Sequence, residues 1–145
     1  MMELIFGKIK DLDPELTFGY FQLRSEIFVL EQQCVYLDMD DQDLDALHVI
    51  GVIDGEVVAG ARILEGESGV HIGRVVVHQK ARGNGLGKDL MQQTMFYVDQ
   101  KFNRPAIEIS AQMYLNKFYS SLGFKNVGKE YLEDGLPHIE MVRAV

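Results

Sequence analysis

Between residues 70 and 102, an apolar strand pattern leads through a glycine-rich loop into an amphipathic helix, and this order constrains the fold more than any other feature. The strand pattern ends in Val75 to Val77, and the loop contains Gly83, Gly85 and Gly87. Glycines let backbone N–H groups turn inward and approach an anion, and the dipole of the following helix favours negative charge there. The segment therefore predicts a phosphate-binding loop, with a tight strand-to-helix turn as the alternative.

Two well-known nucleotide-binding loops do not fit these residues. A Walker loop reads Gly-x-x-x-x-Gly-Lys-Ser/Thr, but here Arg82 stands at the first glycine position and Asp89 at the hydroxyl position. A dinucleotide fingerprint reads Gly-x-Gly-x-x-Gly early in a β-α-β unit, whereas these glycines alternate with single residues and follow antiparallel strand patterns. Both kinds of site are therefore excluded.

Strand and helix patterns alternate along the rest of the chain. Strand patterns cover Glu3 to Lys10, Leu47 to Ile53, Glu56 to Leu64, Val70 to Val77, Ala106 to Ser110, Lys125 to Tyr131 and His138 to Val142. Helical spacing covers Pro14 to Glu31, Leu86 to Phe102 and Met113 to Leu122. Asp54-Gly55 predicts a two-residue hairpin. The order predicts a mixed α/β (α+β) fold, with helices packed on a twisted sheet in one domain of residues 1–145.

The charge and cysteine content exclude several classes of protein. With 14 basic and 22 acidic residues, the chain has no broad positive field for nucleic acid or anionic lipid. No apolar run approaches the roughly 20 residues of a membrane span, and the N-terminus does not read as a signal peptide. Cys34 is the single cysteine and cannot form an internal disulfide. We expect a cytoplasmic protein with no nucleic-acid or membrane partner.

Metal binding is not expected. The histidines show no paired ligand spacing, and they stand at His48, His71, His78 and His138. The acidic run Asp38 to Asp45 lacks the glycine and the terminal glutamate of a calcium loop.

The loop and its surroundings resemble the GNAT superfamily of N-acetyltransferases, and in particular its ElaA-like subfamily. Arg82, Gly85 and Gly87 fill the superfamily pattern Arg/Gln-x-x-Gly-x-Gly/Ala after an apolar strand. The segment Leu23 to Cys34 is similar to the "LR…VFV.EQ.C" block of the subfamily. Further matching blocks are Ala111-Gln112, Phe118-Tyr119, Gly123-Phe124 and Glu133 to His138. The resemblance covers nearly the whole chain.

This resemblance implies a mostly antiparallel twisted sheet, flanked by helices, in which two central strands splay apart and hold acetyl-CoA between them. Those strands would be Ile72 to Val77 and Ala106 to Ser110. Main-chain groups of Val75 and Val77 would hold the pantetheine, while the valine side chains pack in the core. The cofactor-binding residues implied are Val75, Val76, Val77, Arg82, Gly83, Asn84, Gly85, Leu86, Gly87, Lys88, Asn116 and Tyr119.

Acetyl transfer to an amine needs a neutral nucleophile, a donor to the oxyanion and an acid for the departing thiolate. The resemblance implies a backbone N–H near Val75 to Val77 as the oxyanion donor and Tyr119 as the acid. Asn116 precedes Tyr119 by one helical turn and could bind the cofactor arm. The alternative for Tyr119 is an interfacial aromatic whose hydroxyl is satisfied.

The superfamily has no fixed position for the general base, and several residues are candidates. The candidates for the base are Glu31, His48, His71, Glu108 and His138. Among them Glu31 and Glu108 are the preferred catalytic candidates, and Glu31, His48 and His138 are candidates for binding the acceptor. Glu108 alternates with Ile107 and Ile109 and therefore leaves their face of the strand. The alternatives are solvated carboxylates and structural histidines. An acetyl-cysteine at Cys34 is disfavoured, because the superfamily transfers directly.

The expected function is transfer of an acetyl group from acetyl-CoA to a primary amine of a small molecule or protein. A non-catalytic acyl-CoA sensor or partner-binding module, and a transferase that uses another acyl-CoA, remain as alternatives. The acidic run Asp38 to Asp45 would either attract a cationic amine or form a solvated loop. A homodimer is possible, since dimers are common in the superfamily, and the sequence does not choose the acceptor.

Overall fold

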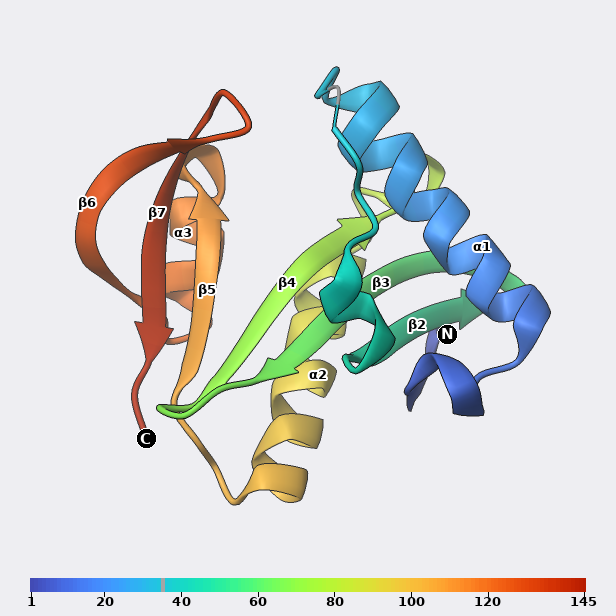
Figure 1. The fold of residues 1–145 in the computed structure, drawn as a ribbon, viewed down its shortest axis with the longest axis horizontal. Coiled ribbons are helices and arrows are strands. Elements are labelled where there is room, and N and C mark those ends of the chain that lie inside the picture. The colour runs from blue at the N-terminus through green and yellow to red at the C-terminus, as the bar shows by residue number, and fades with distance from the viewer. Residues whose placement is uncertain (35) are drawn as a thin grey trace.

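The computed structural model describes residues 1–34 and 36–145, and its centre is a seven-stranded sheet in the order β1-β2-β3-β4-β5-β7-β6 (Figure 1). The strands are β1 (Glu3–Gly7), β2 (Leu47–Ile53), β3 (Glu56–Glu65), β4 (Val70–Val77), β5 (Ile107–Gln112), β6 (Lys125–Glu133) and β7 (Leu136–Arg143). The helices are α1 (Pro14–Arg24), α2 (Leu86–Phe102) and α3 (Asn116–Ser121). The predicted order of strands and helices is confirmed, and so is the mixed, mostly antiparallel sheet.

Helices cover both faces of the sheet. Alternate residues of β3 and β5 face α2 and form the main core with it, because side chains along a strand alternate between its faces. These residues are Ala59, Ala61 and Ile63 on β3, Ile107, Ile109 and Ala111 on β5, and Leu90, Met91 and Val98 on α2. On the other face, α1 crosses β3 so closely that a Cβ at Gly60 would lie 2.6 Å from the Tyr20 ring. Glycine is therefore required at this crossing.

The parallel strands β4 and β5 pair only at their first residues and then diverge (Figure 1). The pairs are Val70 with Ile107 and His71 with Glu108. At the vertex, a Cβ on Gly69 would lie 2.4 Å from the carbonyl oxygen of Ala106, so the close approach needs glycine. Beyond His71 the edge of β4 that faces β5 makes no ladder pairs with it, which leaves a wedge-shaped opening between the two strands.

The helix that begins at Pro14 ends in a π-helical segment, Ser25–Glu31. Its last bond runs from the N–H of Gln32 to the carbonyl of Ile27, five residues back. The sequence predicts the helix to about Glu31 and is right about its length, but the α-helical spacing gives no sign of the wider turn. π-helical turns in proteins are frequent at functional sites.

A buried network of ion pairs fastens the acidic segment to α1 and to the sheet. Arg24 is fully buried and donates to Asp38 and to Asp43, at 2.9 Å in each case. The neighbouring arginines complete the network, with Arg62 at 2.8 Å from Asp40 and Arg74 at 2.8 Å from Asp38. Asp38, Asp40 and Asp43 are therefore counter-ions of arginines. Neither of the two roles predicted for the acidic run, attraction of a cationic amine or a solvated loop, describes these three residues.

His48 belongs to the same network, and its predicted role in acceptor binding is wrong. The ring is fully buried, with Nε2 at 2.8 Å from the carbonyl oxygen of Asp43 and Nδ1 at 2.9 Å from the hydroxyl of Tyr20. Burial lowers the pKa of His48, which keeps the ring neutral. Both ring nitrogens are used within the protein, and none is left for a ligand.

Asp43 makes the stability of the fold depend on acid pH. Its burial alone would raise the pKa of this carboxyl, but the hydrogen bond from Arg24, the N–H of Asp40 and nearby charges outweigh burial and lower the pKa to about 2. The ionised form therefore stabilises the fold above the ordinary pKa, and this contribution disappears as the pH falls through about 2.

We expect the free energy of unfolding to fall by roughly 2 kcal/mol from Asp43 alone as the pH falls from about 4 to about 2. Urea unfolding at several pH values measures it. Asp43→Asn should lack this part of the decline, whereas Asp41→Asn, at an exposed neighbour, should keep it. If the free energy of unfolding falls equally with pH in the two variants, the low pKa assigned to Asp43 is wrong.

Among the described residues, no helix is both long enough and apolar enough to cross a bilayer.

Candidate active site

A groove runs from the glycine-rich loop along the end of β4 to α3. Ten of the predicted cofactor-binding residues line it, namely Val75, Val76, Val77, Arg82, Gly83, Gly85, Leu86, Gly87, Lys88 and Tyr119. Asn84 instead lines a separate depression beside α1. The strand, the loop, the first turn of α2 and α3 thus meet along one surface, as the sequence predicts for them.

The glycine-rich loop that lines this groove has backbone N–H groups without partners among the described residues. Gly83 and Gly85 have φ angles of +88° and +73°, a region in which other residues are strained. The N–H groups from Gly83 to Lys88 donate no hydrogen bond to the described part of the chain. Those of Leu86 to Lys88 also belong to the first turn of α2, where the helix dipole favours an anion. The loop therefore fits a phosphate group.

An ion pair closes one side of the loop. Arg82 lies 2.9 Å from Glu31, and its Nε donates to the carbonyl oxygen of Val77 at 3.0 Å. The π-helical segment ends at Glu31, and the carboxylate of Glu31 lies at the rim of the groove. The structure therefore brings Glu31 to the loop, beside a cation, and does not bring it to the cavity described next.

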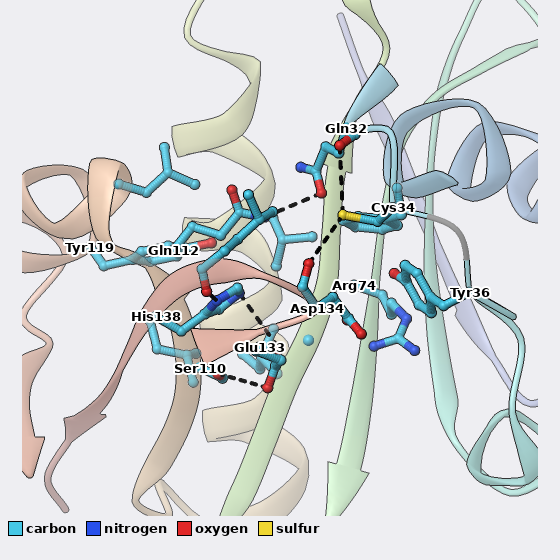
Figure 2. A pocket seen from close by; sticks show the side chains of 17 residues that line it. Gln32, Cys34, Tyr36, Arg74, Ser110, Gln112, Tyr119, Glu133, Asp134 and His138 are labelled. Carbon is cyan, nitrogen blue, oxygen red and sulfur yellow. Dashed lines mark hydrogen bonds and ion pairs between the residues drawn. The ribbon is translucent and has the colours of Figure 1, made fainter. Parts of the chain in front are cut away.

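A second cavity lies in the opening between β4 and β5, walled by the segment after α1 and by the β6–β7 hairpin (Figure 2). Its polar lining includes Cys34, Ser110, Gln112, Glu133 and His138. Phe28, Gln32, Val75, Gln112, Leu115 and Tyr119 line both this cavity and the groove. The two spaces therefore meet at the residues that they share.

Tyr119 lies where the two spaces meet. Its side chain is buried, with 6% of the residue exposed, and its hydroxyl makes no hydrogen bond to the described residues. Burial, with a smaller effect of Tyr114, raises the pKa of Tyr119 to about 12, so the hydroxyl keeps its proton at neutral pH. A protonated hydroxyl without a partner can act as an acid at this point.

Two other predicted site residues lie outside both spaces. Glu108 lies on the face of β5 opposite to Ile107 and Ile109, as the alternation predicts. It lines a neighbouring acidic groove, where Ser68 donates to it at 3.4 Å. The amide of Asn116 donates to Asn126 at 2.7 Å and thereby joins α3 to β6. The structure therefore gives Asn116 a partner within the fold and does not place it along the cofactor groove.

The sequence reasoning missed Ser110, Gln112 and Glu133 as site residues. Ser110 and Gln112 alternate with buried Ile109 and Ala111, so the same alternation that singled out Glu108 could have found them. Glu133 reaches the cavity because β7 pairs with both β5 and β6. Pairing between strands distant in sequence leaves no local signal.

Cys34 borders the second cavity, as Figure 2 shows. Its Sγ lies 3.6 Å from the carbonyl oxygens of both Gln32 and Asp134. Both contacts are with main-chain carbonyl oxygens, which gives no support to an acetyl-cysteine.

The comparison with known families agrees with this geometry. The model of the acetyltransferase (GNAT) domain family matches residues 20–145. The ElaA protein of Escherichia coli is 39% identical over 140 residues, which are 93% of this chain and 92% of ElaA.

Solved structures give the same result. The crystal structure of Escherichia coli ElaA superposes with a TM-score of 0.92 at 38% identity and covers 99% of each chain. That of an acyl-CoA N-acyltransferase from Pseudomonas aeruginosa superposes with a TM-score of 0.93 at 37% identity, covering 99% of this chain and 100% of the other. The similarity extends over the groove, the second cavity and the strands between them.

Proposed function

We propose, from the premise that this chain belongs to the GNAT acetyltransferase family, that it transfers the acetyl group of acetyl-CoA to a primary amine. The acceptor would be a small molecule or a protein. One observation carries the proposal: the groove leads from the free N–H groups of the loop to the buried hydroxyl of Tyr119, and a second cavity reaches the same residue. A donor on one side and an acceptor on the other would meet there.

The residues of the groove suit coenzyme A along its length. N–H groups from Gly83 to Lys88 would hold the pyrophosphate. Main-chain groups of Val75 and Val77, on the edge of β4 that no longer pairs with β5, would pair with the pantetheine amides beside the Val77 carbonyl that accepts from Arg82. Arg82 would add a positive charge at the rim. Bound acetyl-CoA would supply the acetyl group as a thioester.

The chain's own groups can perform the remaining steps. A backbone N–H of the Val75 to Val77 segment would donate to the carbonyl oxygen that gains negative charge, as expected for this family. Tyr119 would donate its proton to the departing sulfur, since its hydroxyl is protonated and has no competing partner among the described residues.

The identity of the acyl group is part of the proposal. The Pseudomonas aeruginosa relative is described as an acyl-CoA N-acyltransferase, which leaves longer chains open. We favour acetyl, and a competition assay with acetyl-, propionyl- and butyryl-CoA measures the preference. The single free cysteine fits a reducing compartment, and we place the protein in the cytoplasm.

Calorimetric titration with acetyl-CoA tests the donor half of the proposal. We expect saturable binding with a dissociation constant of about micromolar order, and competition by free coenzyme A. Absence of binding at millimolar acetyl-CoA would refute the proposal.

Gly85→Ala should weaken acetyl-CoA binding at least roughly tenfold, equivalent to about 1.4 kcal/mol. Alanine at a φ of +73° is strained, and relaxing the strain would turn the loop N–H groups away from the groove. The matched control is Gly55→Ala, at a φ of +80° in the hairpin between β2 and β3. The control should lose a similar amount of stability and keep its affinity for acetyl-CoA. Equal affinities for acetyl-CoA in the two variants would contradict the role of the loop in binding the phosphate.

A further inference from the structure

The ring of His138 is held in one tautomer at the wall of the second cavity. Only 5% of the residue is exposed, and its Nδ1 lies 2.7 Å from the carbonyl oxygen of Leu136. A carbonyl oxygen only accepts, so Nδ1 carries the hydrogen and donates it. In the neutral ring, Nε2 then has a free lone pair, and no described residue donates a hydrogen bond to it. Figure 2 shows the ring at the cavity beside Glu133.

Groups on β5 and β6 surround the same ring. Glu133 lies with its Oε2 3.5 Å from Nε2. Tyr131 stands opposite His138 in the strand register, with the ring centroids 6.0 Å apart. Ser110 bonds the hydroxyl of Tyr131 and donates to Glu133 at 3.4 Å. A positive charge formed on His138 would therefore be next to a carboxylate.

The other candidate bases are occupied or placed elsewhere. Glu31 is paired with Arg82 at the loop, and Glu108 lies in the neighbouring groove. His48 uses both of its nitrogens within the buried network. His71 lines the same neighbouring groove as Glu108. This groove shares Ser110, Glu133 and Asp134 with the second cavity, but neither His71 nor Glu108 lines that cavity. Among the described residues that line the second cavity, His138 supplies the single imidazole.

We infer that His138 is the general base of the transfer, with Glu133 as its positioning residue. The inference rests on the proposed function. Nε2 of His138 accepts one proton from the ammonium of the acceptor, and the neutral amine then forms the C–N bond as the C–S bond of the thioester breaks. The nitrogen loses its second proton to Tyr119 while Tyr119 protonates the sulfur. His138 afterwards releases its proton to water.

The electrostatic surroundings of the cavity agree with this role. The titratable and charged groups that line it with His138 are Cys34, Tyr36, Arg74, Tyr119, Glu133 and Asp134. Arg74 is already paired with Asp38 at 2.8 Å. The carboxylates of Glu133 and Asp134 therefore leave the cavity favourable to an entering ammonium and to a charged imidazole.

His138→Asn tests the inference, because asparagine can still donate to the carbonyl of Leu136 but has no counterpart of Nε2. We expect turnover near neutral pH to fall at least about 100-fold, while acetyl-CoA binding stays unchanged. The deficit should shrink as the pH rises toward the amine's pKa of about 10, because more of the acceptor is then neutral without help. His78→Asn is the matched control, since His78 also lies near a glutamate, Glu26 at 3.8 Å, but outside the cavity.

Glu133→Gln provides a second variant at a half-exposed position that does not endanger folding. We expect it to lower kcat roughly tenfold without changing the affinity for acetyl-CoA, and Glu133→Asp should recover part of the loss. An active wild type whose His138→Asn variant keeps its rate and pH profile would overturn the inference alone. A wild type that does not bind acetyl-CoA would instead overturn the proposed function.

Discussion

Arg24→Met should lower the free energy of unfolding by about 3–5 kcal/mol, because the substitution removes the buried cation that two buried carboxylates share. Arg24 is fully buried, and the side chains of its partners Asp38 and Asp43 are 2% and 4% exposed. The guanidinium also lies 4.9 Å from the ring of Phe21. Methionine keeps much of the volume and removes the charge and every hydrogen bond.

Urea unfolding measures this loss, and Lys129→Met is its control. Lys129 is exposed on β6, so the same loss of positive charge should change the free energy of unfolding by no more than about 0.5 kcal/mol. Hydrogen exchange should also become faster in the segment from Asp38 to Asp43, because Arg24 ties it to α1. A loss below about 1 kcal/mol would show that the network does not hold this segment.

Tyr119→Phe should lower kcat about 100-fold or more, in the range typical of a lost general acid. The ring packs in the core and phenylalanine preserves that packing, so the fold and acetyl-CoA binding should change little. The effect comes from the hydroxyl, whose proton is retained at neutral pH because burial raises the pKa of Tyr119 to about 12. Steady-state kinetics with a saturating amine measure the loss.

Tyr114→Phe is the matched control for this variant. Tyr114 lines the same groove but is 75% exposed and does not line the second cavity. Its replacement should leave kcat within about twofold. If Tyr119→Phe behaves like this control, the departing sulfur takes its proton from another source, and the assignment of the acid is wrong.

Local patterns in the sequence predicted most of the fold. Period-two and helical spacing predicted the strands and the α-helices in their order but not the 3-10 and π-helical segments. Asp54-Gly55 predicted the hairpin whose turn has φ angles of +50° and +80°. These features depend on residues that are close in the sequence, so a local pattern is enough to predict them. The splay of β4 from β5 came from the resemblance, since nothing in either strand alone indicates where their pairing ends.

The site was predictable where it depends on the backbone and less so where it depends on charges. The loop needs glycine at residues 83 and 85 because both have positive φ angles, and glycines in a sequence directly indicate such positions. The role of Arg24 was hidden, because an arginine at a helical position usually faces solvent, and its partners lie 14 and 19 residues away. His48 is likewise held by a distant contact, since its Nδ1 lies against the hydroxyl of Tyr20, 28 residues away in the sequence.

The most direct test of the central claim is to incubate the purified protein with acetyl-CoA and a panel of primary amines and to measure free thiol and acetylated amine together. The account predicts that at least one amine raises thiol release well above hydrolysis, with one acetylated product per thiol, and that Tyr119→Phe abolishes most of both. Saturable acetyl-CoA binding without amine-dependent thiol release across small amines and lysine-containing peptides would contradict it. The chain would then be a binding module that keeps the fold without the transfer.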